Sequence, residues 1–455
     1  MTVPTTAIDE LSRELSPGSV LTDPEILASY ERDRELWAPA AAPLAVVRAT
    51  AAEQISTVLR WATRHSIPVV PRGAGSGLAG AANGVEGGIV LSLEAMDQVL
   101  ALDPTDQYAI VQPGVVTAEL KRLAAAHGLR YAPDPGSAEF CTIGGNVATN
   151  AGGLCCLKYG VTRDSVLGLE VVLADGRILR LGGRTVKDVA GLDLLGLFVG
   201  SEGMLGVVTE VTLRLRPAPR SVATLVATFD ELAAAGRAVA GVLTEGRPSM
   251  CELMDAPTLQ AVEEYRPSGL DTDAAALLLV QTDDGDAEAI ERCARACEEA
   301  GAGFVMTTQD EAESELLTMA RRTALDALEA QGQWLLDDVC VPLSAVPDLV
   351  AGCQEIGGRH GVTVACFGHI GDGNMHPTVV FAPGDEAESR AQRAAEEIAR
   401  LGLRLGGTVT GEHGVGLAKR DLMAEQVGPV HLDVQRAVKH ALDPAGILNP
   451  RKSLG

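Results

Sequence analysis

Residues 71–80 read Pro-Arg-Gly-Ala-Gly-Ser-Gly-Leu-Ala-Gly, and this stretch, together with residues 83–92, decides the fold of the first half of the chain. The glycines fit the pattern G-x-G-x-x-G, which marks a dinucleotide-binding βαβ unit only where a helix comes next. Here the turn-forming residues 83–88 and then the apolar run 89–92 come next, so the sequence disfavours a Rossmann fold. Successive small residues can still surround an anion with backbone N–H groups. A plain tight loop is the simpler alternative.

Two more segments rich in small polar residues lie downstream. Residues 133–153 contain Pro-Asp-Pro-Gly-Ser, Thr-Ile-Gly-Gly-Asn and Thr-Asn-Ala-Gly-Gly, and residues 199–206 read Val-Gly-Ser-Glu-Gly-Met-Leu-Gly. Backbone amides and hydroxyl groups at this density can converge on one polar ligand. Three such segments in one domain predict an extended ligand that contains a pyrophosphate.

The chain divides at Pro217-Ala218-Pro219, which is a plausible domain boundary. Before it, short helices within residues 5–35 precede a turn-rich α+β pattern. Beyond it, the pattern is that of a ferredoxin-like unit, one sheet with helices on one face. The expected strands are 222–229, 249–254, 276–283 and 303–308, and the expected helices between them are 230–245 and 286–300. Helices are also expected at 311–330, 344–360 and 385–405.

Composition excludes several classes of protein. The 455 residues carry a net charge of −24 and only 3% aromatic residues, which argues against nucleic acid and anionic membranes as partners. The nine cysteines are odd in number and irregularly spaced, so they form no disulfide framework and fit a reducing cytoplasm. Met1-Thr2-Val3-Pro4 has no signal-peptide features, and no run of about 18 apolar residues predicts a membrane span.

A second set of chemistry-bearing residues lies near the end of the chain. Residues 369–376 read His-Ile-Gly-Asp-Gly-Asn-Met-His, and residues 411–414 read Gly-Glu-His-Gly. Imidazole and carboxylate groups are ligands of a divalent metal such as zinc. The apolar runs 362–367 and 377–381 predict two strands joined by a loop, with an imidazole at each strand end. Asp-Gly and Gly-Asn are also ordinary turn sequences, but two histidines and a Glu-His pair favour a site. Alone, this set also fits a metal-dependent hydrolase.

Together these residues resemble the vanillyl-alcohol oxidase/p-cresol methylhydroxylase (PCMH) flavoprotein superfamily. More narrowly, they resemble the FAD-linked D-2-hydroxyacid dehydrogenases, of the glycolate oxidase catalytic subunit and D-lactate dehydrogenase type. The motifs that carry the resemblance are residues 71–77, 150–153, 159–160, 200–203, 369–376, 411–414 and 446–450.

The resemblance implies an α+β fold, with a two-subdomain PCMH-type FAD-binding domain and a ferredoxin-like cap domain. The expected segments are an N-terminal helical segment (1–37), the FAD-binding domain (38–218), the cap with the metal site (219–425) and a C-terminal segment that returns to the FAD domain (426–455).

FAD is the implied cofactor. The residues implied to contact it are Pro71, Arg72, Gly73, Ala74, Gly75, Ser76, Gly77, Pro135, Gly136, Ser137, Thr142, Gly144, Gly145, Asn146, Thr149, Gly203, Val208 and Asn449. Some relatives attach FAD covalently through a histidine in the first loop. Residues 72–80 contain no histidine, so non-covalent FAD is expected.

The resemblance also implies a set of catalytic residues. His369, His376 and Glu412 would hold a divalent metal, for which zinc is the first candidate. His413 would be the general base, Arg321 would bind the substrate carboxylate and Asn374 would contact substrate. The flavin N5 would accept the hydride, while a neutral imidazole suits removal of the hydroxyl proton. The alternative for Arg321 is a surface helix residue like its neighbour Arg322.

The substrate class rests on two apolar positions. Relatives that act on D-2-hydroxyglutarate use extra polar residues after the carboxylate-binding arginine, and the corresponding residues here are Leu325 and Leu336. A monocarboxylate such as D-lactate or glycolate, oxidised to the 2-oxo acid, is therefore favoured. A D-2-hydroxyglutarate dehydrogenase and an oxygen-using oxidase are the alternatives, and a non-catalytic electron-transfer subunit is disfavoured because a full catalytic set is present.

The sequence leaves the electron acceptor open among a quinone, a cytochrome, a partner subunit and oxygen. No iron–sulfur cysteine spacing occurs. A homodimer and a location at the inner face of the membrane, within the cytoplasm, stay compatible with the sequence.

Overall fold

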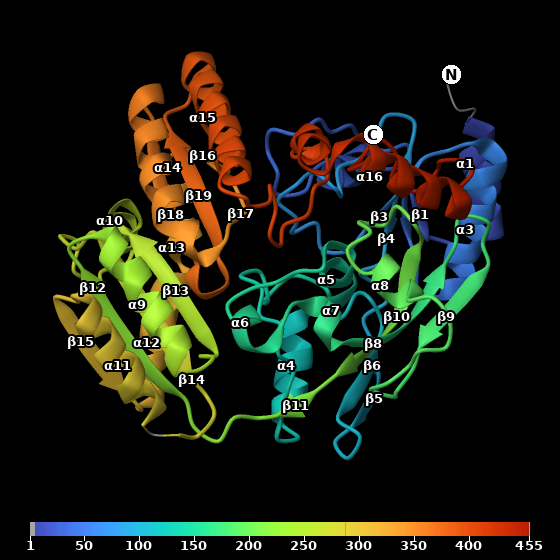
Figure 1. Cartoon of the computed structure of the whole chain (residues 1–455). Helices are drawn as coiled ribbons and strands as arrows, with labels where there is room; N and C mark the ends of the chain where they lie inside the picture. The colour runs from blue at the N-terminus through green and yellow to red at the C-terminus, as the bar shows by residue number, and fades with distance from the viewer. Residues whose placement is uncertain (1–4, 287, 455) are drawn as a thin grey trace. The chain divides into compact units, whose positions relative to one another are not determined.

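The computed structural model describes residues 5–286 and 288–454 (Figure 1). The expectation for Met1-Thr2-Val3-Pro4 lies outside the described residues. The chain forms two compact units: unit 1 comprises Met1–Gly152, Val161–Ala218 and Glu412–Gly455, and unit 2 comprises Gly153–Gly160 and Pro219–Gly411. The boundary expected at 217–219 therefore separates the two units. The expected end of the cap at 425 is too late, because Leu417 and Ala418 already donate backbone hydrogen bonds to Ala79 O of unit 1.

Unit 1 contains two sheets, each with its own core. The first has the order β1-β2-β4-β3, with the last three strands parallel, and contains β1 (Val20–Leu21), β2 (Val46–Arg48), β3 (Val69–Arg72) and β4 (Ile89–Ser92). Helix α3 (Ala52–His65) packs on this sheet because Ile55, Leu59 and Ala62 form one buried apolar face. No helix lies between β3 and β4 in the described residues 73–88, so the Rossmann fold is correctly excluded.

The second sheet of unit 1 is antiparallel, with the order β5-β6-β10-β8-β9. Its strands are β5 (Val99–Asp103), β6 (Tyr108–Val111), β8 (Val166–Val172), β9 (Ile178–Gly182) and β10 (Val207–Arg214). Helix α5 (Ile143–Thr149) packs its Ile143 and Val147 into the core of this sheet. Two cores over two sheets confirm the expected pair of subdomains.

The C-terminal part of unit 1 returns to the first sheet. Helix α16 (Arg420–Leu442) is interrupted at Gly428, which has φ +75°, and at Pro429. After this helix, Leu448 forms a parallel bridge with Val69 of β3. Residues 426–455, expected as a separate C-terminal segment, belong to unit 1 together with residues 412–425.

Unit 2 is built on one sheet of order β15-β12-β14-β13-β18-β19-β16, with β17 (Val339–Cys340) also pairing with β19. The strands are β12 (Ala223–Phe229), β13 (Met250–Asp255), β14 (Ala276–Thr282), β15 (Phe304–Thr308), β16 (Gln333–Leu336), β18 (Thr363–His369) and β19 (Asn374–Phe381). The first four strands, with α9 (Leu232–Glu245) and α11 (Ala289–Ala300), form the expected ferredoxin-like unit.

Helices cover both faces of this sheet. Helices α10 (Ala256–Tyr265), α12 (Glu311–Arg322) and α13 (Ala324–Gln331) share a core with Met250, Met254 and Phe367. Helices α9 and α11 contact the sheet but not that core, so they lie on the other face. The helix expected at 311–330 is two helices, because the chain turns at Thr323. In Figure 1, α14 (Val346–His360) and α15 (Asp385–Arg404) accompany the hairpin β18–β19 in orange.

Among the described residues, no helix is long and apolar enough to cross a membrane.

Candidate active site

The hairpin β18–β19 brings His369 and His376 together on one face of the sheet of unit 2. Phe367 pairs with His376 and His369 pairs with Asn374, so these side chains share the face that carries the α10, α12 and α13 helices. The two imidazole rings meet edge to face with centroids 5.1 Å apart. Each ring offers a nitrogen, and the two nitrogens lie within 4.8 Å of one another. The predicted pair of strands with imidazoles near the strand ends is confirmed.

The turn of this hairpin depends on a glycine. Gly373 has φ +84°, and a Cβ on it would lie 2.1 Å from the carbonyl oxygen of Val341. Val341 N also donates to Gly373 O. A side chain at position 373 would therefore push this turn away from Val341 and would displace the backbone of His369 and Asn374.

Glu252 is the residue that orients His369. It lies on β13 with its side chain 1% exposed, and its Oε1 lies 2.8 Å from His369 Nδ1. Its Oε2 lies 2.8 Å from Arg321 NH2. Burial alone would raise the pKa of Glu252, but the charges of His369 and Arg321 outweigh it, and the pKa falls below its ordinary value. Glu252 was not predicted from the sequence.

Arg321 is buried rather than a surface helix residue. Its side chain is 7% exposed, and its guanidinium carbon lies 4.8 Å from the ring centroid of Phe367. Its Nε has no hydrogen-bond partner among the described residues. A buried N–H without a partner costs free energy unless an acceptor reaches it, so this edge of Arg321 suits a ligand carboxylate.

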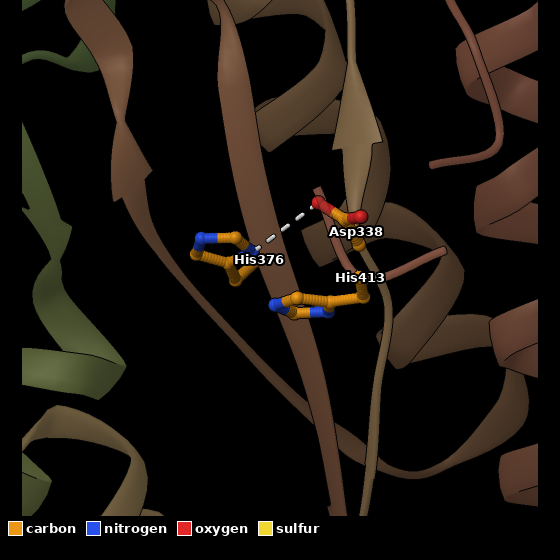
Figure 2. Close-up of side chains that lie close together, drawn as sticks. All are labelled: Asp338, His376 and His413. Carbon is orange, nitrogen blue, oxygen red and sulfur yellow. Dashed lines mark ion pairs between the residues drawn. The ribbon is translucent and has the colours of Figure 1, made fainter. Parts of the chain in front are cut away.

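Asp338 lies beside His376, as Figure 2 shows, and this arrangement resembles that of Glu252 beside His369. Asp338 is fully buried, and its Oδ1 lies 3.7 Å from His376 Nδ1. Its Oδ2 accepts hydrogen bonds from Thr410 Oγ1 at 2.7 Å and from Gly411 N at 2.9 Å. Figure 2 also draws His413, which follows Gly411 by two residues in the chain. Asp338, too, was not predicted from the sequence.

Asn374 lies at the start of β19 and is 6% exposed. Its Oδ1 is buried and has no hydrogen-bond partner among the described residues. Gly411 packs directly on this amide, since a Cβ at position 411 would lie 2.4 Å from Asn374 Oδ1. The amide is therefore held in place and retains an acceptor that a ligand hydroxyl group can satisfy.

Glu412 and His413 belong to unit 1 and follow the last residue of unit 2 directly. Their position in unit 1 is fixed by Glu202, a buried carboxylate that accepts hydrogen bonds from Val415 N at 2.6 Å and Gly416 N at 3.1 Å. Ser453 Oγ donates to the same carboxylate. Burial raises the pKa of Glu202, although these hydrogen bonds oppose the shift. The segment that contains His413, the expected base, is thus held by hydrogen bonds to Glu202 that begin two residues after His413.

The histidine pair fits a divalent metal. A metal-binding histidine commonly donates its second ring N–H to a carboxylate, which fixes the ring and raises its basicity. Glu252 stands at Nδ1 of His369 and Asp338 stands near Nδ1 of His376, so each ring would offer Nε2 to the ion. This donor set of imidazoles suits zinc.

The three glycine-rich segments converge within unit 1. A Cβ on Gly73 would lie 2.3 Å from Thr142 Oγ1, so the first segment touches the start of α5. Gly203 has φ +70°, and a Cβ on it would lie 3.1 Å from Pro71, so the third segment touches the first. The close backbone approach that these glycines permit is what a cradle for an extended phosphate ligand requires.

Asn449 and Lys452, two residues of the C-terminal segment, donate hydrogen bonds to the loop that contains the first glycine-rich segment. Asn449 Nδ2 donates to Ala81 O at 3.0 Å and to Glu202 O at 2.7 Å, while its buried Oδ1 has no hydrogen-bond partner among the described residues. Lys452 Nζ donates to Gly80 O and Asn83 O, and burial lowers the pKa of Lys452 to about 8. The unmatched acceptor of Asn449 fits an N–H group of a flavin ring.

Some residues that the resemblance implies to contact the cofactor have side chains that bond or pack against other parts of the protein. Asn146 is 4% exposed, and its Nδ2 donates to Thr117 Oγ1 at 2.7 Å. Val208 packs against the core of the second sheet. The Arg72 guanidinium donates to Ala82 O and Arg32 O. Asn146 and Val208 can therefore offer a ligand their backbone, and the Arg72 side chain supports the loop that comes after it.

Comparison with known proteins agrees with this geometry. A family described as FAD binding domain matches residues 43–182, and a family described as FAD linked oxidases, C-terminal domain, matches residues 218–453. Among solved structures, p-cresol methylhydroxylase with bound substrate aligns with TM-score 0.81 at 19% identity, over 98% of this chain and 96% of that one. The 4-ethylphenol oxidase of Gulosibacter chungangensis aligns with TM-score 0.81 at 20% identity, over 98% and 96%.

These findings define a flavin-dependent oxidoreductase with the fold of the PCMH superfamily. More narrowly, the chain belongs to the FAD-linked oxidase family that includes FAD-linked 2-hydroxyacid dehydrogenases and oxidases acting on CH–OH donors.

Curated relatives align over nearly the whole chain. Glycolate oxidase subunit GlcD of Bacillus subtilis is 43% identical over 90% of this chain and 88% of its own length. The Escherichia coli K12 protein of the same name is 40% identical over 97% and 90%. The D-lactate dehydrogenase of Anaerostipes hadrus is 35% identical over 97% and 96%.

Proposed function

We propose that the protein oxidises a D-2-hydroxy acid of the D-lactate or glycolate type to the 2-oxo acid, with non-covalent FAD. The relatives named for glycolate and D-lactate support this substrate class. The observation that carries the proposal is the buried chain Arg321–Glu252–His369, in which an arginine suited to a carboxylate and a histidine suited to a metal share one residue.

Each residue of this chain has a task in binding. Arg321 binds the carboxylate of the acid through its unmatched Nε–H, and a guanidinium fork fixes the orientation of a carboxylate. His369 and His376, with Glu412, hold a zinc ion, whose contribution when bound is to polarise the substrate hydroxyl group. Asn374 offers its amide oxygen to the same hydroxyl group.

His413 takes the hydroxyl proton. A neutral imidazole is a suitable base near pH 7, and the anchor through Glu202 fixes the backbone that comes after it. FAD, when bound, supplies the hydride acceptor at its N5 atom. The contacts we assign to FAD are those of residues 71–77, 135–137, 142–149, Gly203, Val208 and Asn449.

Apolar side chains near Arg321 set the size of the acid. Leu325 lies on α13, four residues after Arg321 and beyond the turn at Thr323, and Leu336 lies on β16. Both pack against the core that contains Phe367 and Met254. A second carboxylate placed against these two leucines would be buried among apolar side chains, which do not compensate its charge. We therefore favour a monocarboxylate over D-2-hydroxyglutarate.

The test is a panel of D-lactate, L-lactate, glycolate and D-2-hydroxyglutarate added anaerobically to the purified protein. We expect a yellow protein whose flavin absorption near about 450 nm bleaches with D-lactate or glycolate, as a hydride-accepting cofactor requires. Thorough chelation should abolish bleaching. A colourless protein that cannot be reconstituted with FAD would refute the proposal and leave the metal-dependent hydrolase. Rapid oxygen uptake with substrate would identify an oxidase.

A further inference from the structure

Glu252 occupies a position where a carboxylate is costly. It lies on the central strand β13 between Cys251 and Leu253, which are both buried. A buried charge is tolerated in a protein core when it is paired and hydrogen-bonded. The identity of its partners therefore indicates why a glutamate stands here.

Both oxygens of Glu252 are used, and each by a different element of unit 2. Oε1 lies 2.8 Å from His369 Nδ1 on β18, and Oε2 lies 2.8 Å from Arg321 NH2 on α12. The guanidinium is also held from one side by the ring of Phe367. One carboxylate thus fixes an imidazole and a guanidinium that are 48 positions apart in the sequence.

We propose that Glu252 is a positioning residue shared by the metal-binding and the carboxylate-binding parts of the site. Its Oε1 holds the His369 ring so that Nε2 faces the ion, and its Oε2 holds Arg321 so that Nε faces the acid. The proposal rests on the proposed function, which supplies both ligands. Because one rigid group sets both positions, it also sets the separation between the hydroxyl-binding and carboxylate-binding points.

A glutamine at position 252 tests this role with little change in shape. A carboxylate has two acceptor oxygens, whereas a carboxamide has one, and its NH2 group must face a donor of either His369 or Arg321. For Glu252→Gln we expect the zinc dissociation constant of metal-stripped protein, measured by titration with zinc alone, to rise about 10- to 100-fold. We also expect KM for D-lactate or glycolate to rise by more than kcat falls, because Arg321 binds substrate.

The matched control is Asp255→Asn on the same strand. Asp255 is fully buried and accepts hydrogen bonds from Thr258 N and Oγ1 at the start of α10. Its odd spacing from Glu252 places it on the other face of β13. Zinc affinity and KM of this variant should equal those of the wild type. Glu252→Asp, which keeps the charge but cannot reach both partners, serves as a second variant should glutamine impair folding, and urea unfolding reports on the fold of unit 2, which contains position 252.

Changes of about threefold or more in zinc affinity or KM for either Glu252 variant, with the control unchanged, support the proposal. Smaller changes in both quantities overturn it, provided that the wild type binds zinc and is reduced by substrate. A wild type that binds no zinc and is reduced by no 2-hydroxy acid overturns the proposed function, and this inference with it. The two failures are therefore distinguishable.

Discussion

Replacing Glu202 by glutamine should loosen the backbone on the C-terminal side of His413. The carboxylate accepts hydrogen bonds from Val415 N, Gly416 N and Ser453 Oγ. A hydrogen bond to a charged acceptor contributes about 1 kcal/mol more than one to a neutral acceptor, so three donors would lose about 3 kcal/mol. Burial raises the pKa of Glu202, so removal of the charge offsets this loss. The NH2 group of glutamine, however, must face one of the three donors and leave it unpaired, at a cost of about 1 to 3 kcal/mol. We expect a net loss of about 1 to 3 kcal/mol.

Hydrogen–deuterium exchange measures this loss directly, because Val415 and Gly416 are themselves the donors. A loss of about 1 to 3 kcal/mol corresponds to exchange about 5- to 150-fold faster in a peptide covering residues 410–418. The rate of flavin reduction by substrate should fall in parallel, since His413, the proposed base, is no longer held in one position.

The control for this experiment is Glu170→Gln. Glu170 is also a buried carboxylate of unit 1, but its partners are Thr209 and Arg180 on the second sheet. This variant should leave exchange in residues 410–418 unchanged. Protection in Glu202→Gln within about twofold of the wild type would refute the reasoning, because the three hydrogen bonds would then contribute less than about 0.5 kcal/mol together.

Three further outcomes are expected. Acid precipitation should release the flavin to the supernatant, and flavin retained by the polypeptide would show a covalent link. His413→Ala should keep flavin and zinc but bleach very slowly with substrate, whereas near-normal bleaching would exclude His413 as the base. Burial raises the pKa of Asp255 to about 6 from 3.8, so the stability that this group contributes is complete below about pH 4 and is lost as the pH rises through 6. The free energy of unfolding of Asp255→Asn, measured with urea, should therefore rise relative to that of the wild type by up to about 3 kcal/mol between pH 4 and pH 8. A difference that does not depend on pH would contradict this.

The parts of the fold with strong local signals were predictable from the sequence. The ferredoxin-like unit was evident from the regular alternation of apolar strands and helices, and its observed strand order agrees. The absence of a helix after the first glycine-rich segment was evident from the turn residues at 83–88. The break at Thr323 was missed because residues 311–330 contain no glycine or proline that would mark it. Helix α16 was missed because Gly428-Pro429, which interrupts it, reads as a break in helical sequence.

The histidines of the site were predictable because they stand out in turn-rich sequence. Glu252 and Asp338 were missed because both lie in apolar segments that read as ordinary strands, Met-Cys-Glu-Leu-Met and Leu-Leu-Asp-Asp-Val. The signal was present, since an acidic residue within such an apolar run must be paired when the strand is buried. Its partners are distant in sequence and could not be named without the structure.

The bridge between Val69 and Leu448 has a consequence for biosynthesis. Strand β3 is an edge of its sheet, and Val69 N donates to Ile447 O while Asn449 N donates to Val69 O. At about 5 to 20 residues per second, the ribosome makes residue 447 about 20 to 75 seconds after β3. During that time the nascent chain carries an unpaired strand edge, which is a template for aggregation. Asn449 and Lys452 are also still unmade, so the hydrogen bonds that they donate to residues 80–83 form only after residue 452 has been synthesised.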